Sequence, residues 1–111
     1  MPEKLKALQF LGSSLDDLRD FPEEVRHALG VELLRVQYGG MPLDFKALPS
    51  VGSGAHEIRV HIGGAWRAIY VAKFEVAVYV LHAFQKKTRK TAKSDIELAA
   101  MRYKMIGGTK R

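Results

Sequence analysis

Cysteine is absent from the 111-residue chain. Disulfide scaffolds, thiolate metal sites and cysteine nucleophiles are therefore excluded, and the fold must depend on an apolar core. Long hydrophobic runs are missing as well, because the longest one near the middle spans only Val76 to Leu81, far below the ~20 residues of a membrane helix. The start of the chain, MPEKLKALQF, has no signal-peptide core. We therefore expect a soluble, cytoplasmic protein without a membrane segment.

Internal repeats and low-complexity segments are also missing from the sequence. The composition, 47% hydrophobic and 27% charged, is that of an ordinary globular domain. At roughly 100–200 residues per domain, we expect residues 1–111 to form a single domain. Large multi-step enzymes and two-domain cofactor folds are excluded by this length.

The positive charge lies almost entirely in the second half of the chain. Residues 1–55 carry six Lys/Arg and eight Asp/Glu, whereas residues 56–111 carry twelve and four, so that the net charge of +6 divides into −2 and +8. A cluster of basic residues without an acid stands between the strands and the last helix. Its members are Lys86, Lys87, Arg89, Lys90 and Lys93. Such a cluster is typical of a phosphate-binding surface, and equally of a solvated charge run.

Hydrophobic spacing predicts helices in the first half. A short first strand ends near Leu11, and Ser14 with Asp17 predicts the start of a helix. Pro22 suits the first turn of a second helix. That helix carries apolar residues at steps of four, four and three, namely Val25, Leu29, Leu33 and Val36. Residues 39–54, rich in Gly and Pro, are expected to be a linker.

The second half changes to an alternating pattern. Three strands are expected, around Ile58 to Ile62, from Trp66 to Ala72 and from Val76 to Phe84, joined as an antiparallel meander. A last helix is predicted to begin at Ser94, whose Glu97 completes an S-x-x-E capping box, and to stop at residues 107–108. The order β-α-α-β-β-β-α indicates an α+β fold, with two N-terminal helices on one sheet face and a C-terminal helix.

The register of the first hairpin decides which polar side chains meet. A two-residue turn at residues 63–64 would put Arg59 and Arg67 on opposite faces. A three-residue loop, residues 62–64 with a left-handed Gly64, pairs them and gathers the apolar residues together, so we favour it. A second turn at residues 74–75 would place Arg67 opposite His82. One face would then carry six polar residues: Glu57, Arg59, His61, Arg67, His82 and Lys86.

Such a face has the groups that RNA phosphodiester cleavage needs. Arg and Lys can neutralise the charge that develops on phosphorus, and His82, His61 or Glu57 can move protons when a 2′-hydroxyl attacks. An equally simple interpretation is a surface cross-strand pair of Arg59 with Glu57 and a packed histidine. No metal site is predicted, because His56 and His61 point to opposite sides of a strand.

The string HEIRVHIGGAWRAIYVAKFEVAVYVLHAFQKKTRKT, His56 to Thr91, resembles the phage-type HigB-like toxins of the RelE/ParE superfamily. The combination E-I-R, W-R-x-I-Y and F-Q-K-K-T at these spacings carries the resemblance, which extends back to LGSSLDDLRDFPEEVR and forward through the last helix. It implies a RelE-like fold and a toxin of a type II toxin–antitoxin pair. Toxins of the RelE and HigB type cleave mRNA in the ribosomal A site without a metal or another cofactor.

The resemblance also implies residue roles and partners. Arg67 matches the strand arginine that contacts the scissile phosphate, Arg59 a basic residue one strand earlier, and Lys86 and Lys87 basic positions after the last central strand. Glu57 stands where RelE has lysine, and the carboxy-terminal tyrosine of RelE has no clear match. The expected catalytic residues are therefore Arg67, Arg59, His82, Glu57 and Lys86. The residues expected to bind RNA or the ribosome are Lys87, Arg89, Lys90, Lys93 and His61.

The expected partners are the 70S ribosome with its mRNA and a helix-turn-helix antitoxin of the HigA type, through which the complex binds operator DNA. Two other functions stay open. ParE-like members share the fold yet inhibit DNA gyrase, and a non-catalytic nucleic-acid-binding module would use the same basic surface. Cleavage of RNA that depends on Arg67 separates the first function from both others.

Overall fold

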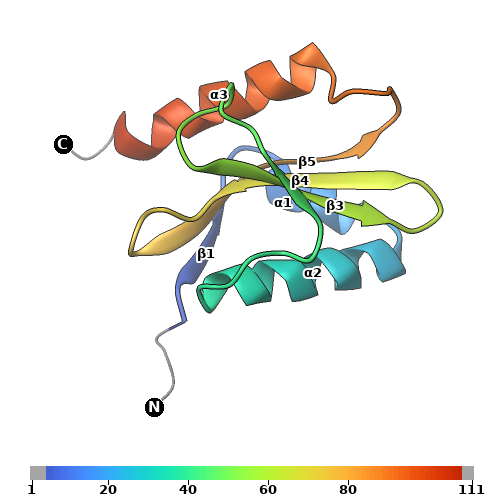
Figure 1. The fold of residues 1–111 in the computed structure, drawn as a ribbon, viewed down its shortest axis with the longest axis horizontal. Helices are drawn as coiled ribbons and strands as arrows, with labels where there is room; N and C mark the ends of the chain where they lie inside the picture. Colours follow the sequence, from blue (N-terminus) through green and yellow to red (C-terminus); the bar gives the residue numbers. More distant parts are fainter. Residues whose placement is uncertain (1–4, 109–111) are drawn as a thin grey trace.

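The computed structural model describes residues 5–108 (Figure 1). Five strands and three helices follow one another along the chain: β1 (Ala7–Phe10), α1 (Ser14–Arg19), α2 (Glu23–Gln37), β2 (Phe45–Ala47), β3 (Ala55–His61), β4 (Ala65–Val71), β5 (Ala77–Lys86) and α3 (Lys93–Gly108). The predicted order is confirmed with one addition, the strand β2 within the expected linker. Its three residues are all exposed, so they lack the apolar alternation by which a strand is found in a sequence.

The strands form one sheet in the order β1-β5-β4-β3-β2. Every neighbouring pair is antiparallel except β1 with β5, which run parallel. After β1 the chain forms α1 and α2, and then the strands β2 to β5, each antiparallel to the one before. The last of these, β5, pairs with β4 on one side and with β1 on the other. The central strands β4 and β5 are almost entirely buried.

The first hairpin has the favoured register. Arg59 pairs with Arg67 and Val60 with Trp66, and the loop closes through a hydrogen bond from the Ile62 amide to the Gly64 carbonyl. Both glycines of the loop have a positive φ, 59° at residue 63 and 139° at residue 64. Gly64 therefore has the positive φ predicted for it, and the preceding glycine has one as well. A residue with a side chain is strained in either conformation.

The second hairpin differs from the prediction. Arg67 pairs with Phe84 and not with His82, which lies opposite Ile69. Two features cause the shift: β4 ends at Val71 while β5 begins only at Ala77, and the pairing is irregular between Ile69 and Tyr70, as at a β-bulge. The shift amounts to two residues, so the side chains keep their predicted face.

The two N-terminal helices share one face of the sheet, as predicted, and α3 covers the other (Figure 1). The helix α2 packs on one face through Val25, Leu29, Leu33 and Val36, all 2% exposed or less, in a core that includes Leu18 of α1. The helix α3 packs on the opposite face, where its residues Ile96, Ala99, Tyr103 and Ile106 meet Ile69, Leu81 and Phe84. The C-terminal helix therefore lies on the face that carries Arg67.

Two predicted helix starts are wrong by one or two residues. The cap of α1 is Ser13, whose hydroxyl donates to Asp17, whereas Ser14 is buried and donates to the Val80 carbonyl. The first turn of α3 forms bonds back to the Ala92 carbonyl, so the capping box from Ser94 does not form. At α1, the buried hydrogen bond of Ser14 to β5 takes its hydroxyl away from the capping role.

Arg102, a buried residue of α3, links this helix by hydrogen bonds to β5 and to Ser13. Arg102 donates to the Leu81 carbonyl at 2.9 Å and to the Ser13 hydroxyl at 3.2 Å. Its side chain lies against Gly12, which has a φ of 57° and no room for a Cβ. No helix within residues 5–108 is long and apolar enough to cross a membrane.

Candidate nucleic-acid interface

One face of the sheet carries the polar residues that the sequence singled out. Strand β3 contributes Glu57, Arg59 and His61 at alternate positions, β4 contributes Arg67, and β5 contributes His82 and Lys86. The observed pairing places all six on one side of the sheet, as predicted, and this is the side on which α3 packs. Lys46 of β2 pairs with Glu57 and adds another cation to this face. We call this group the basic face.

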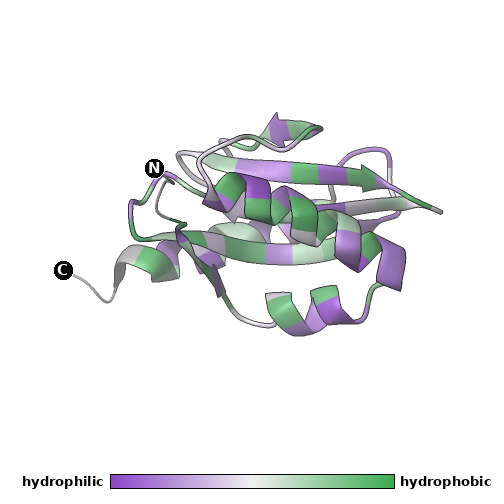
Figure 2. Cartoon of the chain, turned by 90° about the horizontal axis from the view of Figure 1, so that it is seen from below, coloured by the Kyte–Doolittle hydropathy of each residue, from purple (hydrophilic) through white to green (hydrophobic). Residues whose placement is uncertain are grey.

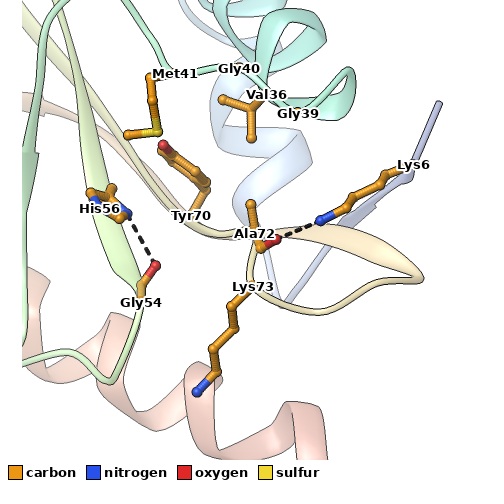
Figure 3. A pocket seen from close by; sticks show the side chains of 10 residues that line it. All are labelled: Lys6, Val36, Gly39, Gly40, Met41, Gly54, His56, Tyr70, Ala72 and Lys73. Carbon is orange, nitrogen blue, oxygen red and sulfur yellow. Dashed lines mark hydrogen bonds between the residues drawn. The ribbon is translucent and has the colours of Figure 1, made fainter. Parts of the chain in front are cut away.

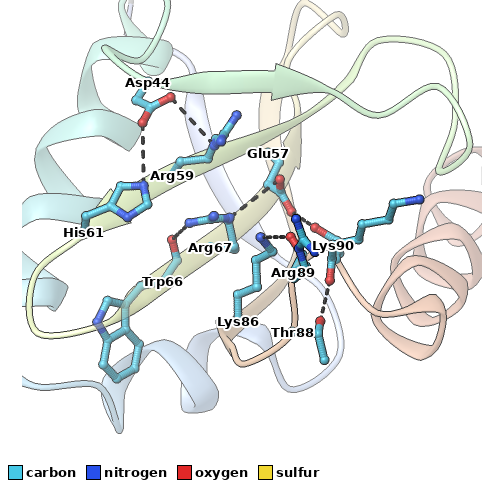
Figure 4. Close-up of polar contacts among 11 residues, drawn as sticks. Asp44, Glu57, Arg59, His61, Trp66, Arg67, Lys86, Thr88, Arg89 and Lys90 are labelled. Carbon is cyan, nitrogen blue, oxygen red and sulfur yellow. Dashed lines mark hydrogen bonds and ion pairs between the residues drawn. The ribbon is translucent and has the colours of Figure 1, made fainter.

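Glu57 and Arg67 form a buried ion pair at the centre of the basic face (Figure 4). Each residue is only 2% exposed, and Nε of Arg67 lies 3.7 Å from Oε1 of Glu57. Arg67 also donates to the Trp66 carbonyl at 3.0 Å, and the other Glu57 oxygen accepts a bond from the Thr91 hydroxyl at 2.6 Å. Burial lowers the pKa of Arg67, and the charge of Glu57 opposes that shift.

Arg59 and His61 are reachable from solvent, and an acid lies between them. Asp44 is 3.8 Å from Nε of Arg59 and 3.9 Å from Nε2 of His61 (Figure 4). The side chain of His61 is 58% exposed and that of Arg59 35% exposed. The sequence analysis missed Asp44 and Lys46, because both lie within residues 39–54, for which the sequence predicts a linker. Only the pairing of β2 with β3 brings them here.

His82 lies at the edge of this arrangement, beside α3. Its Nε2 is 2.7 Å from a carboxylate oxygen of Asp95, and its ring stacks on Phe84 with 4.7 Å between the centroids. Asp95 is a third residue that the sequence analysis missed. His82 is therefore held by the first turn of α3 and by its own strand, and it does not pair with Arg67 across the sheet.

The remaining basic residues follow β5. Lys86 ends the strand and donates to the Arg89 carbonyl at 2.6 Å, and Lys93 opens α3 beside Glu97. The side chains between them are exposed at Lys87, Arg89 and Lys90. Thr91 of the same connection is bonded to Glu57, so this basic loop lies against the buried pair. Exposed lysine and arginine side chains thus lie next to the basic face, just after the C-terminal end of β5.

Metal-ligating residues do not gather in the part of the chain that the structure describes. No group of three or more His, Asp or Glu side chains there could hold a metal ion. What the basic face offers is a set of positive charges around one exposed imidazole. This arrangement can bind the negative charge of a phosphodiester and exchange a proton with a neighbouring hydroxyl group.

A solved structure has a similar fold, and a family model matches most of the chain. A solved structure of an E. coli toxin RelE mutant in the free state is similar to the chain with a TM-score of 0.64 and 20% sequence identity, over 93% of this chain and 99% of that one. The chain therefore has a RelE-like α+β fold. The family model "Phage derived protein Gp49-like (DUF891)" matches residues 16–104, and the chain belongs to this family. No curated protein matches it significantly.

Proposed function

We propose that the chain is the toxin of a type II toxin–antitoxin module, of the HigB-like kind, which stops translation by cleaving mRNA on the ribosome. The observation that carries the proposal is the basic face within a RelE-like fold: the exposed Lys46 and the half-buried Arg59 and Lys86 share this face with the buried Glu57–Arg67 pair. The reaction needs no metal in this proposal, because Arg and Lys take the charge-stabilising role. The protein acts in the cytoplasm, where its substrate is.

The role that we propose for each residue of the basic face depends on how exposed its side chain is. Arg59 and Lys86 contact the scissile phosphate at the surface. Arg67 adds its positive charge from beneath, since at 2% exposure it is covered by its neighbours, and it fixes the Glu57 carboxylate. His61, the most exposed imidazole of the face, joins Glu57 and His82 among the proposed proton carriers.

The basic loop has a separate proposed role. Its exposed cations, Lys87, Arg89, Lys90 and Lys93, hold RNA or ribosomal backbone. The proposed antitoxin, a helix-turn-helix protein of the HigA type, blocks the toxin and recruits the complex to operator DNA.

The proposal is tested by inducing the chain in a bacterial host and mapping new mRNA 5′ ends, with and without a block to translation initiation. The wild-type chain is expected to produce cuts only in translated messages. Arg59→Ala should abolish them, and Arg67→Ala should do so as well. Arg19→Ala is the matched control, because Arg19 is an exposed arginine of α1, on the other side of the sheet.

Two results would redirect the proposal. Growth arrest without new 5′ ends would contradict the nuclease, and the ParE-like inhibition of gyrase would be examined next. RNA binding that depends on Arg59 without cleavage would favour a simple nucleic-acid-binding module. Because Arg67 is buried, circular dichroism of each purified variant must show that it is folded.

A further inference from the structure

The face of the sheet that α2 covers offers few free charges to a nucleic acid. A pocket of about 270 Å³ opens there, at the end of α2 (Figure 3), and its two lysines are already engaged. Lys6 donates to the Ala72 carbonyl at 2.6 Å, and Nζ of Lys73 lies 5.3 Å from the centre of the Phe74 ring. The outward side of α2 also carries apolar residues (Figure 2), among them the exposed Val31. The contacts that decide which RNA binds are therefore expected on the basic face.

Each arginine of the basic face lies beside an acid. Nε of Arg67 is 3.7 Å from Glu57, and Nε of Arg59 is 3.8 Å from Asp44 (Figure 4). Both Nε atoms are buried, and neither makes a hydrogen bond within residues 5–108. These distances exceed the length of a nitrogen–oxygen hydrogen bond, about 2.7–3.2 Å, so the two pairs are held by charge. A pair held in this way can exchange its acid for another anion.

The two acids differ in how far solvent reaches them. Glu57 is 2% exposed and accepts a hydrogen bond from Thr91, so it belongs to the interior. The side chain of Asp44 is 51% exposed, and that of its partner Arg59 is 35% exposed. An RNA phosphate that approaches Arg59 therefore meets an arginine whose charge an exposed carboxylate already balances.

Asp44 also lies beside the exposed imidazole of the basic face. Its second carboxylate oxygen is 3.9 Å from Nε2 of His61 (Figure 4). The charge of Asp44 reaches the buried centre as well: burial lowers the pKa of Arg67, and the charges of Glu57 and, more weakly, Asp44 oppose this shift. One exposed carboxylate thus acts on both solvent-reachable residues of β3 and on the buried arginine of β4.

Backbone hydrogen bonds hold residue 44 in this place. The Leu43 amide donates to the Glu32 carboxylate of α2 at 2.9 Å, and the Asp44 carbonyl accepts from the Arg59 amide at 3.0 Å. Neither bond uses the Asp44 side chain. Asp44→Asn therefore removes the negative charge and leaves the bonds that position the segment.

We propose that Asp44 is a specificity-determining residue of the basic face. Its carboxylate neutralises Arg59 in the free protein, so a phosphate gains this arginine only by displacing the acid. The cost of displacement weakens the binding of RNA that is free in solution. A message that the ribosome holds against the basic face has a high local concentration, which offsets the same cost. The inference rests on the proposed function, because it takes ribosome-bound mRNA as the substrate.

The test measures binding of the purified full chain to a fluorescent single-stranded DNA oligonucleotide, which has the phosphates but lacks the 2′-hydroxyl needed for cleavage. Asp44→Asn should bind it about three- to tenfold more tightly than wild type at low salt, and the gain should shrink as salt screens the charges. Asp20→Asn is the matched control, because it removes the same charge from an exposed residue that follows α1. It should bind within about twofold of wild type.

A double variant shows whether the effect passes through Arg59. In the Arg59→Ala background, Asp44→Asn should change the binding of the oligonucleotide by less than about twofold. A gain as large as that in the wild-type background would contradict the neutralisation of Arg59 by Asp44. Equal binding by Asp44→Asn and Asp20→Asn would overturn the inference as well.

Ribosomes programmed with mRNA separate this inference from the proposed function. Asp44→Asn should raise binding to them by a smaller factor than binding to the free oligonucleotide, and an equal rise would contradict the specificity role. A wild-type chain that neither binds nor cuts on the ribosome would refute the proposed function. Tighter binding of the oligonucleotide by Asp44→Asn would still show, in that case, that Asp44 neutralises Arg59.

Discussion

Glu57 and Arg67 meet across two adjacent strands, with 3.7 Å between a carboxylate oxygen and Nε, and both are almost completely buried. A charge taken out of water in this way is stable only beside its counter-charge. Thr91 adds a hydrogen bond to the carboxylate and connects the basic loop to the pair. The pair thus lies beneath the more exposed residues of the basic face and is also part of the buried interior.

Breaking this pair should destabilise the fold. Glu57→Ala leaves the Arg67 guanidinium buried without its partner and should lower the free energy of unfolding by about 3–5 kcal/mol. Urea unfolding followed by circular dichroism measures this loss. Glu97→Ala, which removes an exposed carboxylate paired with Lys93, is expected to cost at most about 1 kcal/mol. A loss at Glu57 no greater than that at Glu97 would contradict the account.

The contact between Gly12 and Arg102 makes a second prediction. Gly12 has a φ of 57°, and a Cβ there would lie 2.3 Å from Nε of Arg102. Gly12→Ala should therefore cost about 2 kcal/mol or more, through backbone strain and displacement of Arg102 from the Leu81 carbonyl. Gly30→Ala, in the middle of α2 with open space around it, should instead stabilise by up to about 1 kcal/mol. Thermal unfolding of the two variants should show opposite shifts, and equal shifts would refute this.

Tyr70 predicts a loss of stability at alkaline pH. Burial raises the pKa of Tyr70 from 10.0 to about 12. The unfolded chain releases this proton above pH 10, whereas the folded chain keeps it, so folding stability falls as pH rises from 10 to about 12. Tyr70→Phe should remove this contribution, about 2–3 kcal/mol at the upper end. Urea unfolding of both proteins between pH 9 and 12 measures the difference, and parallel curves would speak against the burial of an ionisable hydroxyl here.

Salt should weaken RNA binding through the basic face. Each phosphate contact releases counterions, so removing one surface arginine lowers the slope of log K against log salt by about one unit or slightly less. Arg59→Ala is expected to show this smaller slope for a short single-stranded RNA. Arg19→Ala should keep the wild-type slope, because Arg19 lies on α1, on the other face of the sheet. Equal slopes for both variants would place the RNA elsewhere.

The sequence predicts much of the fold and part of the site. The stripe of Val25, Leu29, Leu33 and Val36 is buried as predicted, because its helical spacing is a strong signal. The pairing of Arg59 with Arg67 follows from a glycine loop and from which residues must be inside. Both signals come from residues that lie close together in the sequence, so the sequence alone reveals them.

Other parts of the site depend on pairings that no local pattern encodes. The prediction that Arg67 pairs with His82 is wrong, because β5 begins only at Ala77 and the pairing is irregular between Ile69 and Tyr70. Asp44 reaches Arg59 only because a short, fully exposed strand pairs with β3. Asp95 reaches His82 only because α3 folds over this face of the sheet.

The most direct test of the central claim uses the purified chain, ribosomes programmed with a labelled mRNA, and the same mRNA free in solution. The account predicts cleavage only on the ribosome, lost in Arg59→Ala and kept in Arg19→Ala. Intact mRNA on the ribosome with folded wild-type protein, or cleavage that Arg59→Ala leaves unchanged, would contradict the assignment of the basic face as the site of RNA cleavage.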